Sequence, residues 1–375
     1  MILLENMMEI KIMQNELLSL INISLRAISL KNNTSILEGI LFIAKDNKLT
    51  LKSTDLELAI ETSTECKVEK EGEVLLNASM ISNIVRKLPN DEVYIKVDRE
   101  KVFIQSENAK FNIIAMDIYS YPEFPTFENK VDFYVQENLL KVATKQTIFA
   151  AAIDDYRIVL NGVDVEIENK NVDFVALDGH RIAKRSFKIE EDIEKKVIIP
   201  PRALNEISKI VPEGSVVGVS LVKGSAIFTF ENTIFSTRVI DGEYLNYKAL
   251  FSYEHKTKVT VARRDLINAI ERANIIYKAE KGDLVTFTID DTSILVEGSS
   301  EIGDLKDIID IKKEGDNLKI AFNSKYVLEG LKTIEQDFVE ITFNGRAGAC
   351  IIKPEDENID YTYLVLPVLL QDSQY

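Results

Sequence analysis

The most conspicuous candidate for chemistry is the tetrapeptide Asp178-Gly179-His180-Arg181, in which a carboxylate and an imidazole stand two residues apart. An Asp and a His at this spacing could ligate a metal ion, or act together as acid and base. A metal site needs further ligands, and the only other histidine, His255, lies in a polar segment far along the chain. A metal-dependent hydrolase using Asp178 and His180 is therefore a minor alternative, and a turn that follows a strand is the simpler interpretation.

Other signatures of catalysis are absent from the sequence. It contains no GxxxxGK[ST], GxGxxG or GxSxG segment, so neither a phosphate-binding loop nor a serine nucleophile elbow is indicated. Cys66 and Cys350 form no CxxC pair and no disulfide framework, which fits a reducing cytoplasm. We expect no catalytic residue, no metal and no cofactor.

The chain has 375 residues and a net charge of −16, with 46% hydrophobic residues. That length indicates two or three globular domains. No apolar run is long enough for a membrane helix, and Glu5 interrupts the first apolar stretch, so we expect neither a membrane span nor a secretion signal. The acidic balance counts against a nucleic-acid partner only if the charge is spread evenly along the chain.

The helices and strands that position any functional side chain follow a repeat of 123 residues. A short apolar strand ends at Asn77, at Pro200 and again at Asn323, and each end is followed by an apolar stripe with helical spacing. Asn suits the N-cap of a helix and Pro suits its first turn. A second helix is expected to begin near Asn15, Glu137 and Arg263.

Alternating apolar residues around the helices predict β-hairpins. The predicted turns include Asp46-Asn47, Asn169-Lys170, Lys223-Gly224 and, as a strong type I′ signal, Asn344-Gly345. Aromatic stretches near residues 128 and 254, the first of them with Pro122 and Pro125, indicate boundaries. We predict an α+β protein of three similar domains, each with antiparallel sheet and two helices, spanning residues 1–128, 129–254 and 255–375.

The charge is distributed unevenly in this predicted architecture. The six expected helices, residues 14–31, 77–88, 136–147, 200–211, 263–281 and 323–336, carry 15 Lys and Arg against 8 Asp and Glu, a net of +7. The rest of the chain then carries −23. Basic helices on one surface could attract phosphates without contacting bases. The alternative is that Lys and Arg merely favour solvated helix faces.

The apolar segment from Tyr363 to Leu370 is unusual for a chain end. Tyr363 to Leu366 are expected to form a last strand that stops at Pro367, which leaves Val368 outside the strand ladder. Apolar residues beyond the strand could line a groove for a partner peptide.

Taken together, these segments resemble the bacterial DNA polymerase III beta subunits, the beta sliding clamps, over nearly the whole length. The motifs that carry the resemblance are residues 35–37 and 53–57, then 160–163, 176–183, 197–200 and 239–242, and finally 322–328 with 363–367. The seven residues before Met8 exceed the family pattern, so either Met1 or Met8 could be the natural start. Five residues also follow Leu370, where family members often end.

The resemblance implies a head-to-tail homodimer whose six domains close into a ring around duplex DNA, with helices lining the hole. Such a clamp performs no chemistry and tethers the polymerase near the primer end. The implied partners are double-stranded DNA, bound without sequence preference, the polymerase alpha subunit, the clamp loader and other proteins that carry a clamp-binding motif. No membrane partner is implied, and the expected location is the cytoplasm, at the nucleoid.

The family's partner-peptide pocket lies between the second and third domains. By resemblance it comprises Leu160, Leu177, Gly179, His180, Arg181, Ile182, Leu245, Leu250, Asn323, Tyr326, Arg346, Val365, Leu366, Pro367 and Val368. Leu177 replaces a common Thr, Leu245 replaces a common Pro, and Leu369 stands where Arg is frequent. These departures keep the pocket apolar but alter its peptide preference.

Two further sets of residues follow from the resemblance. The expected DNA contacts are Lys31, Lys141, Lys145, Arg157, Arg202 and Lys209. The expected dimer interface joins Phe111 and Ile113 of the first domain to Ile275 and Ile276 of the third.

An acidic protein-interaction hub that never meets DNA remains the second alternative.

Overall fold

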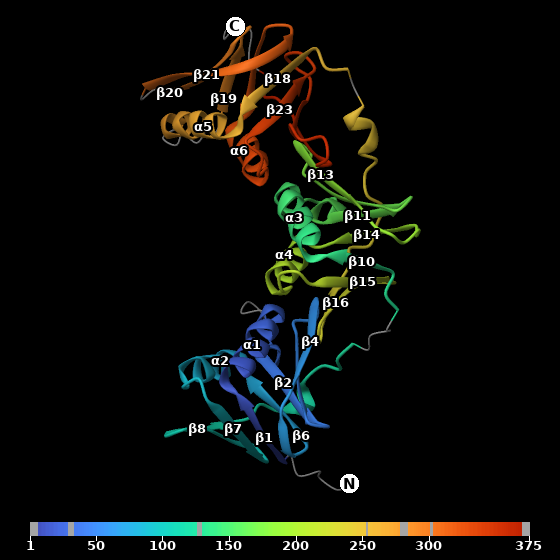
Figure 1. The fold of residues 1–375 in the computed structure, drawn as a ribbon, viewed down its shortest axis with the longest axis vertical. Helices are drawn as coiled ribbons and strands as arrows, with labels where there is room; N and C mark the ends of the chain where they lie inside the picture. The colour runs from blue at the N-terminus through green and yellow to red at the C-terminus, as the bar shows by residue number, and fades with distance from the viewer. Residues whose placement is uncertain are drawn as a thin grey trace. The chain divides into compact units, whose positions relative to one another are not determined.

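Antiparallel sheets dominate the computed structural model, which describes residues 7–28, 34–125, 130–252, 254–277, 284–300 and 303–369 (Figure 1). The described helices are α1 (Gln14–Ser24), α2 (Ala78–Lys87), α3 (Glu137–Thr147), α4 (Pro201–Ile210), α5 (Arg263–Tyr277) and α6 (Ser324–Thr333). Within the described ranges, no helix combines the length and apolar character that crossing a membrane requires.

The 123-residue repeat is visible in where these helices begin. α2, α4 and α6 start at residues 78, 201 and 324, each directly after one of the predicted break residues. The Asn77 side chain accepts a hydrogen bond from the Met80 amide at 3.0 Å, and Asn323 accepts one from the Lys325 amide at 3.0 Å. Both are the predicted N-caps, which satisfy amides that the first helical turn leaves without a partner.

The chain folds into two compact units, and the first contains residues 1–138 and 206–239. Its five-stranded sheet has the order β5 (Lys67–Lys70), β1 (Met7–Met13), β7 (Glu92–Asp98), β8 (Lys101–Ser106) and β9 (Ala109–Ile114). Its eight-stranded sheet has the order β10 (Phe133–Gln136), β15 (Val216–Val222), β16 (Ser225–Phe230), β17 (Thr233–Arg238), β4 (Leu58–Glu65), β3 (Lys48–Thr54), β2 (Gly39–Lys45) and β6 (Gly72–Asn77). α1 and α2 pack side by side, and the apolar faces of helices and strands meet in one buried core.

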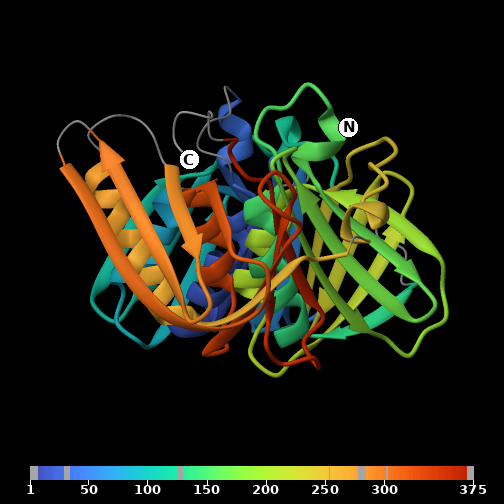
Figure 2. The same ribbon diagram turned by 90° about the horizontal axis from the view of Figure 1, so that it is seen from above.

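The second unit contains residues 139–205 and 240–375 and has a twelve-stranded sheet. The strand order is β14 (Lys195–Ile199), β11 (Val163–Glu168), β12 (Asn171–Leu177), β13 (Arg181–Lys188), β25 (Tyr361–Val365), β24 (Cys350–Pro354), β23 (Phe338–Phe343), β18 (Thr257–Ala262), β21 (Gly303–Gly315), β20 (Ser293–Ser300), β19 (Leu284–Ile289) and β22 (Leu318–Asn323). α5 packs on β20 and β21, and the view from above shows that long hairpin beside the helix (Figure 2).

The middle part of the chain is divided between the two units. β10 and β15 to β17 extend the sheet of the first unit, where β17 pairs with β4 so that Phe235 faces Ile60. β11 to β14 extend the sheet of the second, where β13 pairs with β25 so that Ala183 faces Tyr363. Sheets therefore run across the predicted domain boundaries, and those boundaries remain predictions. The boundary at residue 128 lies outside the described residues.

Two local expectations are wrong. Asn344-Gly345 is not a two-residue turn, because β23 ends at Phe343 and β24 begins only at Cys350, which leaves a six-residue loop. The first helix ends at Ser24, so Arg26 lies in a 3-10 turn beyond it. Val368 lies beyond the end of β25, as expected, and its amide donates to the Ala321 carbonyl at 2.8 Å in an isolated bridge.

Candidate functional site

An apolar cavity of about 450 Å³ opens on the second unit where β12 and β25 end and β13 begins. Its lining residues are Arg157, Leu177, Gly179, His180, Arg181, Ile182, Leu245, Ala249, Leu250, Ser252, Ala349, Leu364 and Leu366. Leu245, Leu250 and Leu366 keep 44%, 51% and 42% of their surfaces exposed, so the apolar lining reaches the solvent. An apolar concavity with a few polar groups at its edge is typical of a binding site.

The Asp178-Gly179-His180-Arg181 segment is the turn between β12 and β13 and forms one wall of the cavity. The Asp178 carboxylate accepts hydrogen bonds from the backbone amides of His180 and Arg181 at 2.9 and 3.2 Å. Gly179 has φ of +90°, a conformation that favours glycine. The tetrapeptide is therefore a stabilised turn, as the simpler interpretation predicted.

Arg181 is held by the protein on every side. Its guanidinium donates to Asp178 Oδ2 at 2.8 Å through Nε and to the Phe149 carbonyl at 2.7 Å through Nη2, and it also pairs with Glu329. It lies 4.4 Å from the centre of the Tyr326 ring, within cation–π range. Burial opposes the charge, yet the bond to Glu329 raises the pKa of Arg181 above its ordinary value. The side chain is 8% exposed, so it supports the wall and presents little surface to a ligand.

The arrangement offers no metal site at this turn. Both Asp178 carboxylate oxygens already accept hydrogen bonds from the turn and from Arg181. The residues that the structure describes contain no cluster of three or more His, Cys, Asp or Glu able to hold a metal ion. The His180 ring instead stacks on Tyr326 of α6, with centroids 6.0 Å apart and planes at 24°.

The predicted pocket residues divide into those that line the cavity and those that surround it. Eight line it, namely Leu177, Gly179, His180, Arg181, Ile182, Leu245, Leu250 and Leu366. Leu160 is buried in the core beneath the cavity, and Tyr326 stacks on His180. Asn323 caps α6, and Arg346 is exposed in the loop between β23 and β24. Pro367 is half-buried, and Val368 forms the bridge to Ala321.

Val365 does not line this cavity, for a reason that strand geometry supplies. Successive side chains of a strand point to opposite faces, so Leu364 and Leu366 share one face and Val365 points to the other. Leu364 and Leu366 line the cavity, whereas Val365 is fully buried. Period-two alternation could have predicted Leu364 from the sequence.

The other residues that sequence reasoning missed come from loops. Ala249 and Ser252 lie in the segment after Ile240, and Ala349 lies in the loop before β24. Small residues in loops carry no periodic signal, so nothing in the sequence marks them. Arg157 was expected near DNA, but it lines the cavity, where its guanidinium binds the Asp155 carboxylate at 3.1 Å.

Two of the four expected DNA-contacting residues on described helices form ion pairs within the protein. Lys145 of α3 pairs with Glu335 at 2.9 Å, and Lys209 of α4 pairs with Glu206 at 2.7 Å. Lys141 is half-buried, and Arg202 is exposed on α4. Lys31 lies outside the described residues. The six described α-helices carry 11 Lys and Arg against 6 Asp and Glu, a net of +5. The predicted +7 also counted Arg26, which lies beyond α1, and Lys31 and residues 278–281, which lie outside the described residues.

The expected interface residues lie on an edge strand and a helix. Phe111 and Ile113 point to one face of β9, at the edge of the five-stranded sheet, and both are half-buried. Ile275 of α5 is 69% exposed and Ile276 is half-buried. Exposed aliphatic side chains near an open sheet edge are typical of a surface that meets another chain.

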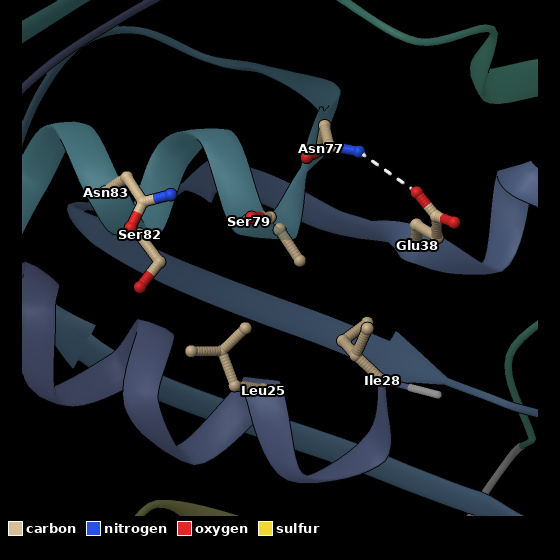
Figure 3. Close-up of a pocket in the computed structure, with 8 residues that line it drawn as sticks. Leu25, Ile28, Glu38, Asn77, Ser79, Ser82 and Asn83 are labelled. Atoms are coloured by element: carbon tan, nitrogen blue, oxygen red, sulfur yellow. Dashed lines mark hydrogen bonds between the residues drawn. The ribbon is translucent and has the colours of Figure 1, made fainter. Parts of the chain in front are cut away.

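A second cavity, of about 230 Å³, lies in the first unit between the end of α1 and the start of α2 (Figure 3). Leu25 and Ile28 face it from one side, and on the other the Asn77 side chain donates to Glu38 at 3.4 Å. Its remaining lining residues are Ala78, Ser79, Ser82 and Asn83. Sequence reasoning predicted no site here. The lining has an acidic group and no basic one, so it offers little to a phosphate.

Comparison with known proteins covers both units. Profiles for the N-terminal, central and C-terminal domains of the DNA polymerase III beta subunit match residues 8–125, 134–246 and 248–369. The chain is 31% identical to the beta sliding clamp of Staphylococcus epidermidis, with 96% of this chain and 99% of that protein covered. It is 30% identical to the Bacillus subtilis protein of the same name, with the same coverage of each chain.

Solved structures give the same result. A putative DNA polymerase III beta subunit from Eubacterium rectale superposes with a TM-score of 0.91 at 34% identity, covering 96% of this chain and 99% of that one. The DNA polymerase sliding clamp of Bacillus subtilis superposes with a TM-score of 0.93 at 30% identity, covering 97% and 100%. The expected three-domain fold of antiparallel sheets is confirmed.

Proposed function

Because this chain belongs to the DNA polymerase III beta subunit family, the beta sliding clamps, we propose that two copies of it close head to tail into a ring around duplex DNA. The family assignment confirms the resemblance read from the sequence and the role of a processivity factor. A clamp of this family is not a catalyst, so the hydrolase alternative on Asp178 and His180 is wrong.

The observation that carries ring closure is a pair of open sheet edges, one in each unit. β9 pairs only with β8 among the described strands, and its Ile114 is 66% exposed. Residues 303–310 of β21 pair with β20, whereas β18 pairs only with residues 311–315, so one side of 303–310 has no described partner strand. Ile308 in that stretch is 69% exposed.

These two edges could pair with each other, because each has one side without a described partner strand. They belong to different units of the chain. If β9 of one copy pairs with residues 303–310 of the other, Phe111 and Ile113 meet the aliphatic surface of α5 at Ile275 and Ile276. The contact is heterologous, and two copies related by half a turn make it twice and close. Pairing also removes the free edges, which otherwise favour uncontrolled association.

Attraction to DNA in such a ring is weak and diffuse. The helices carry +5 while the rest of the chain carries −21, which favours phosphates at the helices and disfavours them elsewhere. Because Lys145 and Lys209 already have carboxylate partners, we expect retention on DNA to depend on encirclement more than on affinity. We expect the protein to work in the cytoplasm, at the nucleoid, because a ring around duplex DNA has to act where that DNA lies.

Retention on circular and linear DNA tests the topological mechanism. A clamp that has been loaded on nicked circular DNA should dissociate slowly and should leave within seconds to minutes once the circle is cut. Ile275→Asp, at the proposed interface, should abolish retention, whereas Ile153→Asp, at a position 89% exposed and away from either edge, should not. Equal retention on circular and linear DNA would refute encirclement.

The apolar cavity of the second unit is proposed as the docking site for peptides of the polymerase alpha subunit, the clamp loader and other partners. Its lining is mostly aliphatic and partly open, which suits a short apolar segment of a partner. The supporting observation is that eight residues expected from the resemblance come together around one cavity.

Leu366→Asp should weaken capture of a peptide from the cognate polymerase at least tenfold, because a carboxylate would enter the apolar lining. Phe338→Asp is the matched control, since Phe338 is 49% exposed, close to the 42% of Leu366, and does not line the cavity. Val365→Ala is unsuitable, because truncating this fully buried side chain would destabilise the fold. Equal affinity of the Leu366→Asp and Phe338→Asp variants would contradict the assignment.

A further inference from the structure

One wall of the apolar cavity belongs to no sheet. Residues 240–252, which we name the strap, leave β17 and carry four of the lining residues, namely Leu245, Ala249, Leu250 and Ser252. The strap contains only one short 3-10 helix, Lys248–Phe251. Its side chains can form a defined wall only if something holds the strap against the sheet, because an isolated loop segment of this length has little order of its own.

Contacts outside the cavity hold the strap against β11 and β12. The Tyr247 hydroxyl donates to Glu166 Oε2 at 2.9 Å, and the Lys248 ammonium donates to Glu166 Oε1 at 3.1 Å. Both oxygens of one carboxylate thus bind successive residues of the strap. Nearer its start, the Tyr244 hydroxyl accepts a hydrogen bond from the Leu177 amide at 3.2 Å.

Glu166 is well placed to act as an anchor. It lies on β11, between Lys196 of β14 and Asp173 of β12 in the sheet register, so its backbone is fixed on both sides. Its side chain is 20% exposed, while Tyr247 is 2% exposed, so water competes poorly for the hydroxyl contact. Burial would raise the pKa of Glu166, but the bonds from Lys248 and Tyr247 hold it below its ordinary value.

The geometry points to Glu166 as a positioning residue for peptide binding: it touches no ligand but fixes the strap, and with it the Leu245 and Leu250 side of the cavity. This inference rests on the proposed role of the cavity as a peptide site. With the anchor present, the wall is formed before the peptide arrives, so binding does not bear the entropy of ordering the strap. Without the anchor, the strap must become ordered when the peptide binds, and this lowers the affinity.

Two substitutions separate the anchor's hydrogen bond from its charge. Glu166→Gln keeps an oxygen that can accept from Tyr247 but removes the ion pair with Lys248, and Glu166→Ala removes both. The control is Glu340→Ala on β23, which breaks a comparable pair with Lys258 at 2.5 Å, away from the cavity. Glu340 is 28% exposed and so resembles Glu166 in burial.

The affinity of the full-length clamp for a fluorescent peptide from the cognate polymerase is measured alongside amide hydrogen exchange. We expect affinity about tenfold weaker for Glu166→Ala, a smaller loss for Glu166→Gln, and no change for Glu340→Ala. Exchange should accelerate in residues 243–252 while the amides of β11 and β12 stay protected. Tyr247→Phe combined with Glu166→Ala should cost little more than Glu166→Ala alone, because both remove the same contact.

Three results would overturn the inference. Unchanged affinity with unchanged exchange in Glu166→Ala would mean that the strap is held by other contacts. Faster exchange without a change in affinity would mean that strap order does not matter for binding. A loss of protection throughout β11 and β12 would mean that Glu166 acts on the fold and not on the strap. If the unaltered clamp binds no peptide at all, the proposed function of the cavity fails, whereas the exchange data still report on the anchor.

Discussion

Replacing Gly330 by Ala should destabilise the second unit, although Ala is the better helix former. Gly330 lies inside α6, where a Cβ atom would stand 2.3 and 2.4 Å from two ring carbons of Tyr363. Carbon atoms prefer a separation of about 3.5 Å, so the ring would have to retreat by about 1.2 Å. Tyr363 is fully buried, and its hydroxyl donates to the Tyr326 carbonyl at 2.9 Å. The Phe149 ring, centred 5.5 Å away, limits that retreat.

The expected cost follows from two opposing effects. Overpacking a rigid core costs about 1–3 kcal/mol. Ala gains about 1 kcal/mol over Gly inside a helix. A net loss of up to about 2 kcal/mol is expected, which should accelerate amide exchange in α6 and β25 by up to roughly 30-fold. Hydrogen exchange suits a chain of several domains, whose unfolding need not be two-state.

A second background tests the reasoning directly. In Tyr363→Leu the obstructing ring carbons are gone, so Gly330→Ala should become stabilising by up to about 1 kcal/mol, and exchange in α6 should slow. Lys332→Ala, an exposed position on the same helix, should change exchange by less than threefold in either background. If Gly330→Ala stabilised α6 in the presence of Tyr363, or had equal effects in both backgrounds, the packing argument would be refuted.

Three further outcomes are expected. Asn77→Ala should destabilise the first unit by about 1 kcal/mol, since it removes the acceptor for the Met80 amide at the start of α2, and local exchange at that helix end measures the loss. The fully buried Asp164 has its pKa raised to about 6 by burial, so the folded state binds this proton more tightly than the unfolded chain and stability falls as pH rises from about 4 to 6. The stability of Asp164→Asn relative to the unaltered protein should therefore increase by roughly 2 kcal/mol when the pH is raised from 4.5 to 7.5, as thermal unfolding at the two pH values would show. The same stability difference at both pH values would contradict this. Burial raises the pKa of Cys66 to about 11 and that of the fully buried Cys350 further, so neither thiol should react readily with iodoacetamide at pH 8, as mass spectrometry would show.

Much of the local structure was predictable because short-range rules determine it. The 123-residue repeat marked where α2, α4 and α6 begin, since Asn caps and an N-terminal Pro act within one helical turn. The Asp46-Asn47 and Asn169-Lys170 turns were also predictable, because Asp and Asn tolerate the positive φ that the structure shows at Asp46, Asn47 and Asn169. The two-residue turn predicted at Asn344-Gly345 is wrong because the length of that loop is set by the pairing of Phe343 with Cys350 and not by the turn residues.

The site was predictable only as far as contiguous motifs reach. The turn around Gly179 and the apolar chain end could be recognised in the sequence. Val365, expected in the pocket, does not line the cavity, because the face to which a side chain points alternates along the strand. The helix charge was overestimated because α1 ends at Ser24, before Arg26. The pair of Lys209 with Glu206 follows from their i,i+3 spacing, whereas the partner of Lys145 could not be foreseen, since Glu335 is remote in sequence.

The sequence by itself determined the repeated strand–helix units, the two N-caps and the family to which the chain belongs. Tertiary structure alone decided which strands pair across the predicted domain boundaries, as β17 does with β4 and β13 with β25. It also decided that Glu166 binds the strap and that Arg181 binds Glu329, 148 residues away. The physical reason is range: caps, turns and periodicity act over a few residues, whereas sheet edges and buried charges find their partners only when the chain has folded.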